Sequence, residues 1–361
     1  MKNYQKILII LSLAACQPSE KSNPLRLNDI QVIGSHNSYK IGIERPLMSL
    51  LIQEDSNAIG LDYAHLSLAE QLDLGIRGLE LDVLYDPYGG AFTKPKGIEI
   101  LDSLGLEAMP YDTMQLLNPG FKVFHIPDID FRSHCLTFKG CLSNIKEWSD
   151  NHPDHIPIII TINPKNSGVR KPGFTPVIPF DRQVLDSLDK EIREVFTEEE
   201  LVTPLQIKGS HASLRDAILE KGWPELDSVW GRVLFVLDAG SGVTDDYLVE
   251  NDYSKPMFVN VDEEHPQAGF FIMNNPISME KEIQDRVKKG FMVRTRSDAN
   301  TTEAREGNFK RYEAAIRSGA HLISTDYYLE ELSPNNDFQI EFENGAYAQC
   351  NPILKPEACK L

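Results

Sequence analysis

The chain has 361 residues, of which 36 are basic and 54 acidic, so its formal net charge is −18. An acidic excess of this size disfavours binding to nucleic acid and non-specific adsorption to anionic lipid, although it leaves open a lipid held in a specific pocket. No internal repeat, low-complexity tract or charged linker divides the sequence after residue 26, and the remaining length of about 335 residues is usual for one α/β barrel with insertions.

The first residues have the layout of a bacterial lipoprotein signal peptide. Two lysines precede an apolar run over 7–13, which is too short to cross a bilayer, and Ala14-Ala15-Cys16 resembles a lipobox. We expect residues 1–15 to be removed, Cys16 to carry lipid, and residues 16–26 to form a tether. The protein would then be exported to the cell envelope, possible destinations being the outer membrane and the medium. The alternative is an ordinary secretory signal with an incidental cysteine. Loss of the two lysines leaves 34 basic residues and a net charge near −20.

Eight short apolar runs have the pattern of buried parallel strands separated by helix-like sequence. The predicted strands cover 30–33, 78–83, 121–124, 156–162, 233–237, 257–259, 291–293 and 322–324. The predicted helices cover 67–74, 141–151, 181–195, 213–221, 279–289 and 302–318. This alternation predicts a (β/α)8 TIM-type barrel, in one domain over 27–361. The sixth strand is weakly marked, and residues 270–273 compete with 257–259 for its place.

Polar side chains follow these apolar runs where each run ends. In such barrels the carboxyl ends of the strands gather around one mouth, which holds the reactive groups. We therefore expect the following residues to share one mouth: His36, Glu80, Asp82, His125, Asn163, Asp238, Arg294 and Asp326.

Glu80 and Asp82 are spaced for a common metal ion. Because side chains alternate along a strand, both carboxylates point to the same side. Two enclosed carboxylates repel each other unless a cation or a proton lies between them. With the side-chain oxygen of Asn37 they form an oxygen set that suits Ca²⁺. The alternative is a pair of salt bridges to basic residues of the barrel such as Arg77.

His36 and His125 are candidates for proton transfer. A single histidine after an apolar run is more often structural than catalytic, but two of them beside a carboxylate pair indicate acid–base chemistry. The other seven histidines lack such neighbours and are expected to be structural. No cysteine–histidine spacing typical of a zinc site is present in the sequence.

Four cysteines follow Cys16, an even number that fits an oxidising location. They form two close pairs in sequence, Cys135 with Cys141 and Cys350 with Cys359, so a disulfide within each pair would close only a short loop. The alternative is four free thiols in a protein that stays in the cytosol, which the signal peptide argues against.

Three motifs resemble the calcium-dependent phosphatidylinositol-specific phospholipase C family, specifically its secreted bacterial branch. They are Gly-Ser-His-Asn-Ser-Tyr at 34–39, Arg-Gly-Leu-Glu-Leu-Asp at 77–82 and Phe-His at 124–125. The resemblance continues through residues 294–299 and 324–327 and covers nearly the whole mature chain. It implies that His36 and His125 perform acid–base catalysis and that Asn37, Glu80 and Asp82 bind Ca²⁺. Where the family usually has a fourth, acidic ligand, this sequence has Asn163, so we expect weaker calcium binding or compensation by an acid such as Asp238.

The resemblance implies cleavage of a phosphatidylinositol-like lipid to diacylglycerol and a cyclic or open inositol phosphate. His36 would take a proton from the inositol 2-hydroxyl and His125 would give one to the glycerol oxygen, although these roles can be exchanged. Lys165, Arg294 and Arg296 would contact the phosphorylated headgroup, their alternative role being salt bridges at the rim. We expect a monomer whose membrane contact is the lipid at Cys16.

Two other functions remain open. A glycerophosphodiester phosphodiesterase also uses a barrel, two histidines and a Glu-x-Asp pair, but it favours His-Arg-Gly and His-Asp where this chain has His36-Asn37-Ser38 and His125-Ile126. A lipid-anchored binding protein without activity is suggested by Asn163 alone.

Overall fold

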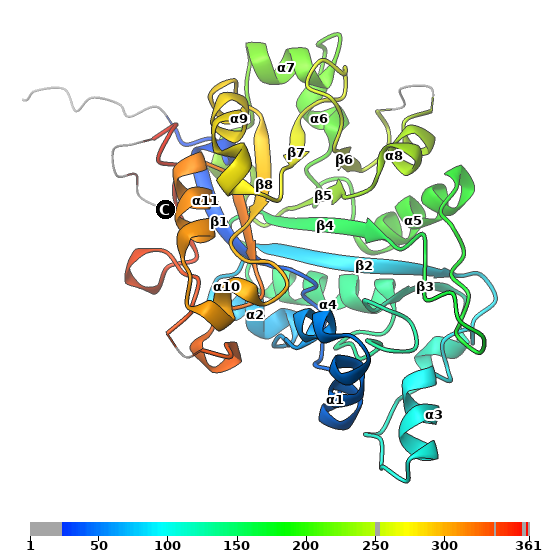
Figure 1. The fold of residues 1–361 in the computed structure, drawn as a ribbon. Helices are drawn as coiled ribbons and strands as arrows, with labels where there is room; N and C mark the ends of the chain where they lie inside the picture. The colour runs from blue at the N-terminus through cyan, green and yellow to red at the C-terminus, as the bar shows by residue number, and fades with distance from the viewer. Residues whose placement is uncertain (1–23, 250–252, 336, 356–358, 360–361) are drawn as a thin grey trace, which may run out of the picture.

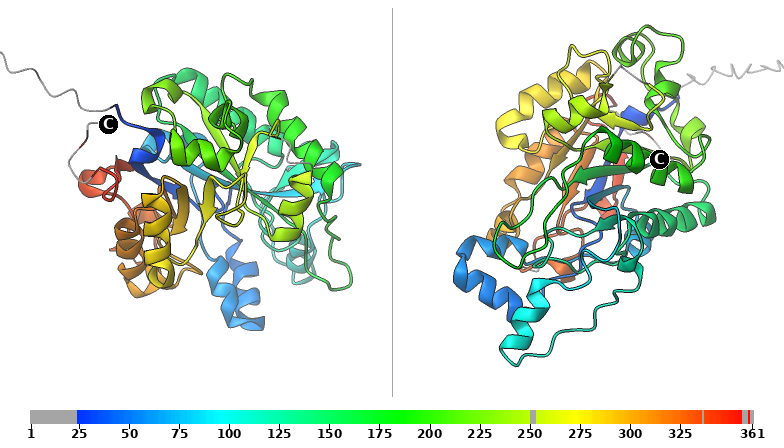
Figure 2. Two further views of the ribbon diagram at one scale, coloured as in Figure 1. Left: turned by 90° about the horizontal axis from the view of Figure 1, so that it is seen from above. Right: turned by 90° about the vertical axis from the view of Figure 1, so that its right-hand side faces the viewer.

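The computed structural model describes residues 24–249, 253–335, 337–355 and 359. Eight parallel strands form a nearly closed barrel with helices around it (Figures 1 and 2). In their order around the barrel they are β6 (Met257–Val259), β5 (Val233–Leu237), β4 (Ile158–Pro164), β2 (Gly78–Asp86), β1 (Ile30–Ser35), β9 (Leu322–Thr325), β8 (Met292–Arg296) and β7 (Phe270–Ile272). The predicted barrel is confirmed. Residues 257–259 and 270–273 do not compete for one strand, because β6 and β7 both belong to the barrel.

One predicted barrel strand is wrong. The strand predicted over 121–124 corresponds to β3 (Gly120–Val123), which pairs antiparallel with the far end of β2, with Val83 opposite Val123 and Asp86 opposite Gly120. β2 is nine residues long and extends beyond the barrel, so the chain folds back along the extension. A short buried apolar run has the same pattern in either direction, which is why sequence periodicity did not separate the two cases.

Each predicted helical range contains helix, with differences at the ends. The helices are α1 (Arg45–Glu54), α2 (Leu68–Leu74), α3 (Lys96–Ser103), α4 (Phe138–Asn151), α5 (Arg182–Val195), α6 (Pro204–Lys208), α7 (Leu214–Glu220), α8 (Ser241–Tyr247), α9 (Pro276–Lys288), α10 (Thr302–Glu306) and α11 (Lys310–Ser318). Of these, α1, α3, α6 and α8 were not predicted. The helix predicted over 302–318 is two helices, because Gly307 takes a left-handed conformation with φ 61° and ends α10. α4 begins at Phe138 because the Thr137 side chain caps it.

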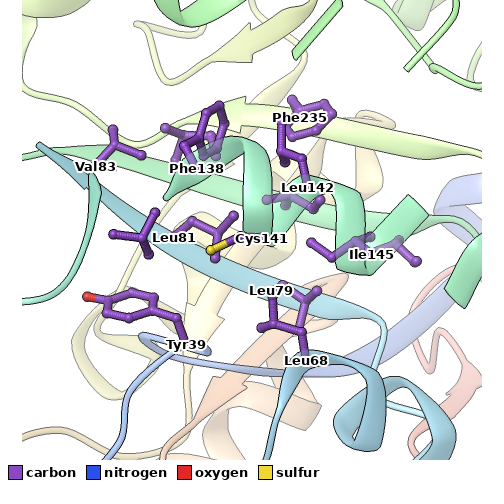
Figure 3. Packing of buried hydrophobic residues seen from close by; sticks show 14 of the residues in the cluster. Tyr39, Leu68, Leu79, Leu81, Val83, Phe138, Cys141, Leu142, Ile145 and Phe235 are labelled. Carbon is purple, nitrogen blue, oxygen red and sulfur yellow. The ribbon is translucent and has the colours of Figure 1, made fainter. Parts of the chain in front are cut away.

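Alternate residues of the strands face the helices and the barrel interior. On β2, Leu79, Leu81 and Val83 lie in a large core with side chains of α4 such as Leu142 and Ile145 (Figure 3). The intervening positions, 78, 80 and 82, face the barrel interior. The carboxylates predicted from the spacing of two therefore belong to the inward face of β2.

The first and last described segments contact the rest of the barrel through hydrogen bonds. The signal peptide and Cys16 lie outside the described residues, as does most of the predicted tether. At the last two residues of the predicted tether, Leu25 O accepts a hydrogen bond from Leu226 N, and Arg26 Nη1 donates to Trp223 O. Disulfides join Cys135 to Cys141 and Cys350 to Cys359, as predicted. The second begins in β10 (Ala348–Cys350), an unpredicted strand antiparallel to β1.

Candidate active site

His36 follows β1 and is held by a carboxylate from the neighbouring strand β9. Its Nδ1 lies 2.8 Å from Asp326 Oδ1, and its Nε2 lies 3.9 Å from Glu80 Oε1. The Arg296 guanidinium lies against the same ring, with Nη1 3.3 Å from Nε2. Burial and the charge of Arg296 place the pKa of His36 well below its ordinary value, against an opposing effect of Glu80. In a neutral imidazole that donates from Nδ1 to Asp326, Nε2 is the nitrogen with a lone pair and can accept a proton.

His125 has a similar arrangement built from different elements. Its Nδ1 lies 2.9 Å from Asp130 Oδ2, and the other oxygen of Asp130 lies 2.7 Å from Lys40 Nζ. Its side chain is 20% exposed, against 16% for His36. Both imidazoles are thus fixed through Nδ1 to a carboxylate and remain partly open to solvent, which suits them for proton transfer.

The residues after β1 align the acidic pair of β2. Asn37 has φ 50°, and the left-handed backbone there turns the chain across the barrel mouth. Ser38 N then donates to Glu80 O at 3.0 Å, and Ser38 Oγ accepts from Glu80 N at 2.7 Å. These bonds fix the strand at Glu80, so the His-Asn motif and the Glu-x-Asp motif are assembled as one unit.

Glu80 and Asp82 each pair with a basic residue. Arg294 Nη2 lies 2.5 Å from Glu80 Oε2, and Lys165 Nζ lies 2.5 Å from Asp82 Oδ2. The salt bridges considered from the sequence are present, but their partners are not Arg77, whose guanidinium lies over the ring of Trp148 instead. Two of the basic residues predicted to contact substrate, Arg294 and Lys165, therefore lie beside the acidic pair.

The donor set fits a calcium ion in its chemistry. Asn37 Oδ1 and Asp82 Oδ1 are buried without a hydrogen-bond partner among the described residues, whereas Asp82 Oδ2 lies against the Lys165 ammonium group. Buried acceptors without donors indicate a missing cation or donor. Within the described part of the chain, no three His, Cys, Asp or Glu side chains form a group that could hold a metal ion. A calcium ion would be held by Asn37, Glu80 and Asp82. Because only two of these ligands are carboxylates, amide oxygens such as that of Asn37 would have to complete the coordination.

Asn163 and Asp238 extend this donor set along the neighbouring strands. Asn163 is the register partner of Asp82 on β4, and Asp238 N donates to Ile162 O at 2.8 Å. Asp238 Oδ2 lies 3.8 Å from Arg294 Nη1. Burial, with smaller effects of Glu80 and Asp82, raises the pKa of Asp238 to about 6, against the opposing charge of Arg294.

Most of the predicted residues lie together, and the structure adds partners that the sequence did not reveal. Glu80 lies beside both His36 and Arg294, and Arg296 lies against the His36 ring. The charge of His125 is one of the smaller causes that lower the pKa of His36. Asp130 and Lys40 were missed. Asp130 had a local signal, an acid five residues after a candidate histidine, whereas Lys40 had none.

Comparisons with known proteins agree with this fold. Residues 25–352 match the family model described as phosphoinositide phospholipase C, Ca²⁺-dependent. The structure resembles a calcium-dependent phosphoinositol-specific phospholipase C from a Pseudomonas species, with TM-score 0.54, 17% identity and coverage of 91% of this chain and 96% of that one. It also resembles a Ca²⁺-dependent enzyme of the same kind from Streptomyces antibioticus, with TM-score 0.53, 17% identity and coverage of 84% and 95%. Curated protein sequences give no match.

Proposed function

The chain belongs to the Ca²⁺-dependent phosphoinositide phospholipase C family, and from this premise we propose that it cleaves phosphatidylinositol by acid–base catalysis between His36 and His125. It is a phosphoric diester hydrolase of the phospholipase C kind. The observation that carries the proposal is the matched pair of histidines. Each binds a carboxylate through Nδ1, so each directs its Nε2 away from that carboxylate.

In the proposed reaction, the inositol 2-hydroxyl attacks the neighbouring phosphorus. Its oxygen forms a bond to phosphorus while the bond from phosphorus to the glycerol oxygen breaks. His36 Nε2 takes the hydroxyl proton, and His125 gives its proton to the departing glycerol oxygen. The products are diacylglycerol and a cyclic inositol phosphate. Each proton transfer typically contributes about 10² to 10⁴-fold.

The other site residues orient His36 and supply charges around the reacting phosphate. Asp326 keeps the Nδ1 proton of His36 in place, so that Nε2 is the basic nitrogen. Arg294, Arg296 and Lys165, which lie against Glu80, His36 and Asp82, are the cations that would bind the phosphate oxygens when substrate enters. A calcium ion held by Asn37, Glu80 and Asp82 would supply charge stabilisation at the phosphate and lower the pKa of the attacking hydroxyl.

The test measures turnover of phosphatidylinositol, glycerophosphoinositol and sphingomyelin, with calcium and with a chelator, and identifies products by ³¹P NMR. We expect calcium-dependent release of inositol phosphate from phosphatidylinositol alone. His36→Ala and His125→Ala should each lower kcat by about 10² to 10⁴-fold. His211→Ala, at a histidine paired with Glu220 away from the site, is the matched control. Preference for glycerophosphoinositol, or full activity in either site variant, would contradict the proposal.

We also propose that the enzyme is an exported lipoprotein anchored through Cys16 and acting as a monomer. The support is the N-terminal sequence, which lies outside the described residues. In the described part of the chain, no helix has the length and apolar character needed to span a bilayer. Labelling with a fatty acid should mark the wild type but not Cys16→Ser, and labelling of both would contradict the anchor.

A further inference from the structure

Lys40 is a fully buried lysine that the proposed reaction does not use. The side chains of Lys40 and Asp130 are both 0% exposed, and Lys40 Nζ lies 2.7 Å from Asp130 Oδ1. Asp130 binds His125 Nδ1 through its other oxygen, at 2.9 Å. The three side chains therefore form one chain of contacts in which a single carboxylate is shared by a lysine and a catalytic histidine.

A buried ion pair is weak evidence for stability, because the desolvation of both charges offsets their attraction. Burial opposes the ionisation of Asp130, yet Lys40 and His125 outweigh it, so the pKa of Asp130 lies below its ordinary value. The pair keeps an ionised carboxylate at His125. An apolar pair would fill the same volume but would give His125 no acceptor for its Nδ1 proton.

The backbone around Lys40 ties its segment to the loop that carries Asp130. Lys40 forms an isolated antiparallel bridge with Ser133, and Ile41 N donates to Arg132 O at 3.2 Å. Backbone contacts thus join the loop with Asp130 to the segment after β1. These contacts join the chain next to His36 to the chain next to His125.

Lys40 also contacts Tyr63, an aromatic residue that binds the candidate metal ligand Asn37. Its Nζ lies 4.8 Å from the centroid of the Tyr63 ring. Tyr63 OH accepts a hydrogen bond from Asn37 Nδ2 at 2.7 Å, which leaves Asn37 Oδ1 as the unpartnered oxygen. One buried ammonium group therefore contacts the side chains that orient both His125 and Asn37.

We propose that Lys40 is a positioning residue that holds Asp130 against His125 and limits how strongly this carboxylate favours the protonated imidazole. The inference rests on the proposed function and adds to it. Asp130 alone, buried beside the imidazole, would stabilise the imidazolium strongly and slow release of its proton. Sharing the carboxylate with a fixed positive charge reduces that effect, so His125 can give up a proton in each turnover.

The charged groups that face His125 set the direction of the expected change. Asp130 from its own loop contacts the ring, and Lys40 lies behind Asp130. From the end of β1, His36 also interacts electrostatically with His125. Removal of the lysine charge leaves Asp130 as a full negative charge at the ring. The protonated imidazole then becomes more favourable, so the general acid stays protonated to higher pH.

The test compares pH–rate profiles of the full enzyme on phosphatidylinositol with titrations of the histidine ring resonances by NMR. In Lys40→Met, the alkaline limb and the pH midpoint of the His125 resonances should both rise by about one pH unit. In Lys40→Met/Asp130→Asn, where neither charge remains, both should return toward the wild-type values. If Lys40→Met does not fold, the double variant is compared with Asp130→Asn, and both quantities should be higher in the double variant.

Lys122→Met is the matched control. Lys122 is also a buried lysine, with its Nζ 3.6 Å from Asp86, and the charges acting on it are those of Asp86 and Glu191, outside the site. Lys122→Met should lower the stability of the protein without shifting the alkaline limb of the pH–rate profile or the pH midpoint of the His125 resonances. Unmoved profiles and midpoints in the Lys40 variants would overturn the inference. No turnover by the wild type would instead contradict the proposed function, and the NMR titration would still decide the role of Lys40.

Discussion

At the residue scale, the two histidines of the site use the same device with different partners. Asp326 holds His36 Nδ1 and is also 3.4 Å from Arg296 Nη2, while Asp130 holds His125 Nδ1 and pairs with Lys40. Each carboxylate is balanced by a cation that is not the histidine. This balance allows a buried carboxylate to fix the tautomer of a ring without holding the ring in its charged form.

The role of Asp326 can be tested by an isosteric change. Asp326→Asn should lower kcat by about 10² to 10⁴-fold, because the amide can offer an N–H to Nδ1 and so place the ring proton on Nε2. Initial rates with saturating phosphatidylinositol measure the effect. Asp86→Asn is the control, since Asp86 is equally buried but pairs with Lys122. A change of less than threefold in kcat would show that Asp326 does not set the tautomer.

At the element scale, the site depends on the close approach of β1 and β2. Gly34 and Gly78 are register partners, and a Cβ on Gly78 would lie 2.1 Å from Leu322 Cδ1 and 2.9 Å from Gly34 Cα. Glycine at both positions lets the Leu322 side chain fill the interior beneath the site. The inward positions directly above Gly34 and Gly78 are those of His36 and Glu80.

Gly78→Ala should therefore destabilise the fold by overpacking, by about 1–3 kcal/mol. Urea unfolding followed by circular dichroism measures the free energy of unfolding. Gly240→Ala is the matched control, because an added Cβ at Gly240 meets no atom within 4 Å, and it should change that free energy by less than about 0.5 kcal/mol. Equal stabilities of the two variants would rule out the close packing as a constraint.

At the scale of the whole molecule, the barrel is open on one side and continuous on the other. β6 and β7 end the hydrogen-bonded path, and across the gap Ile272 N donates to the side chain of Asn260 rather than to a strand. β1 and β2, which carry the oxygen donors, lie near the middle of the path. The candidate metal ligands are therefore placed on the most continuous part of the sheet.

Because these ligands belong to different strands, calcium should stabilise the fold as a whole. Binding to the native state at about 100 times the Kd adds about 2.7 kcal/mol, which raises Tm. Thermal unfolding with calcium and with a chelator should show this rise in the wild type and not in Asp82→Asn. Glu99→Gln, at a partly exposed acid on α3, should keep it. A Tm that does not respond to calcium would contradict the metal site.

The sequence was sufficient to predict the barrel and most of the residues at its mouth. Alternation of apolar runs with helical patterns indicates parallel strands, and a spacing of two places Glu80 and Asp82 on one face whatever surrounds them. Motif order indicated the family, and the even cysteine count indicated both disulfides. These features depend on local periodicity and residue identity, which a sequence contains directly.

The tertiary structure alone decided the direction of β3 and the partners of the charged groups. His125 was predicted after a parallel barrel strand, but it follows an antiparallel strand that returns along β2 toward Asp82. Glu80 pairs with Arg294 across 214 positions of sequence, and Lys40 pairs with Asp130 across 90. Such pairs form because buried charges must find compensation wherever the packed chain brings one within reach, and no local pattern specifies which residue that is.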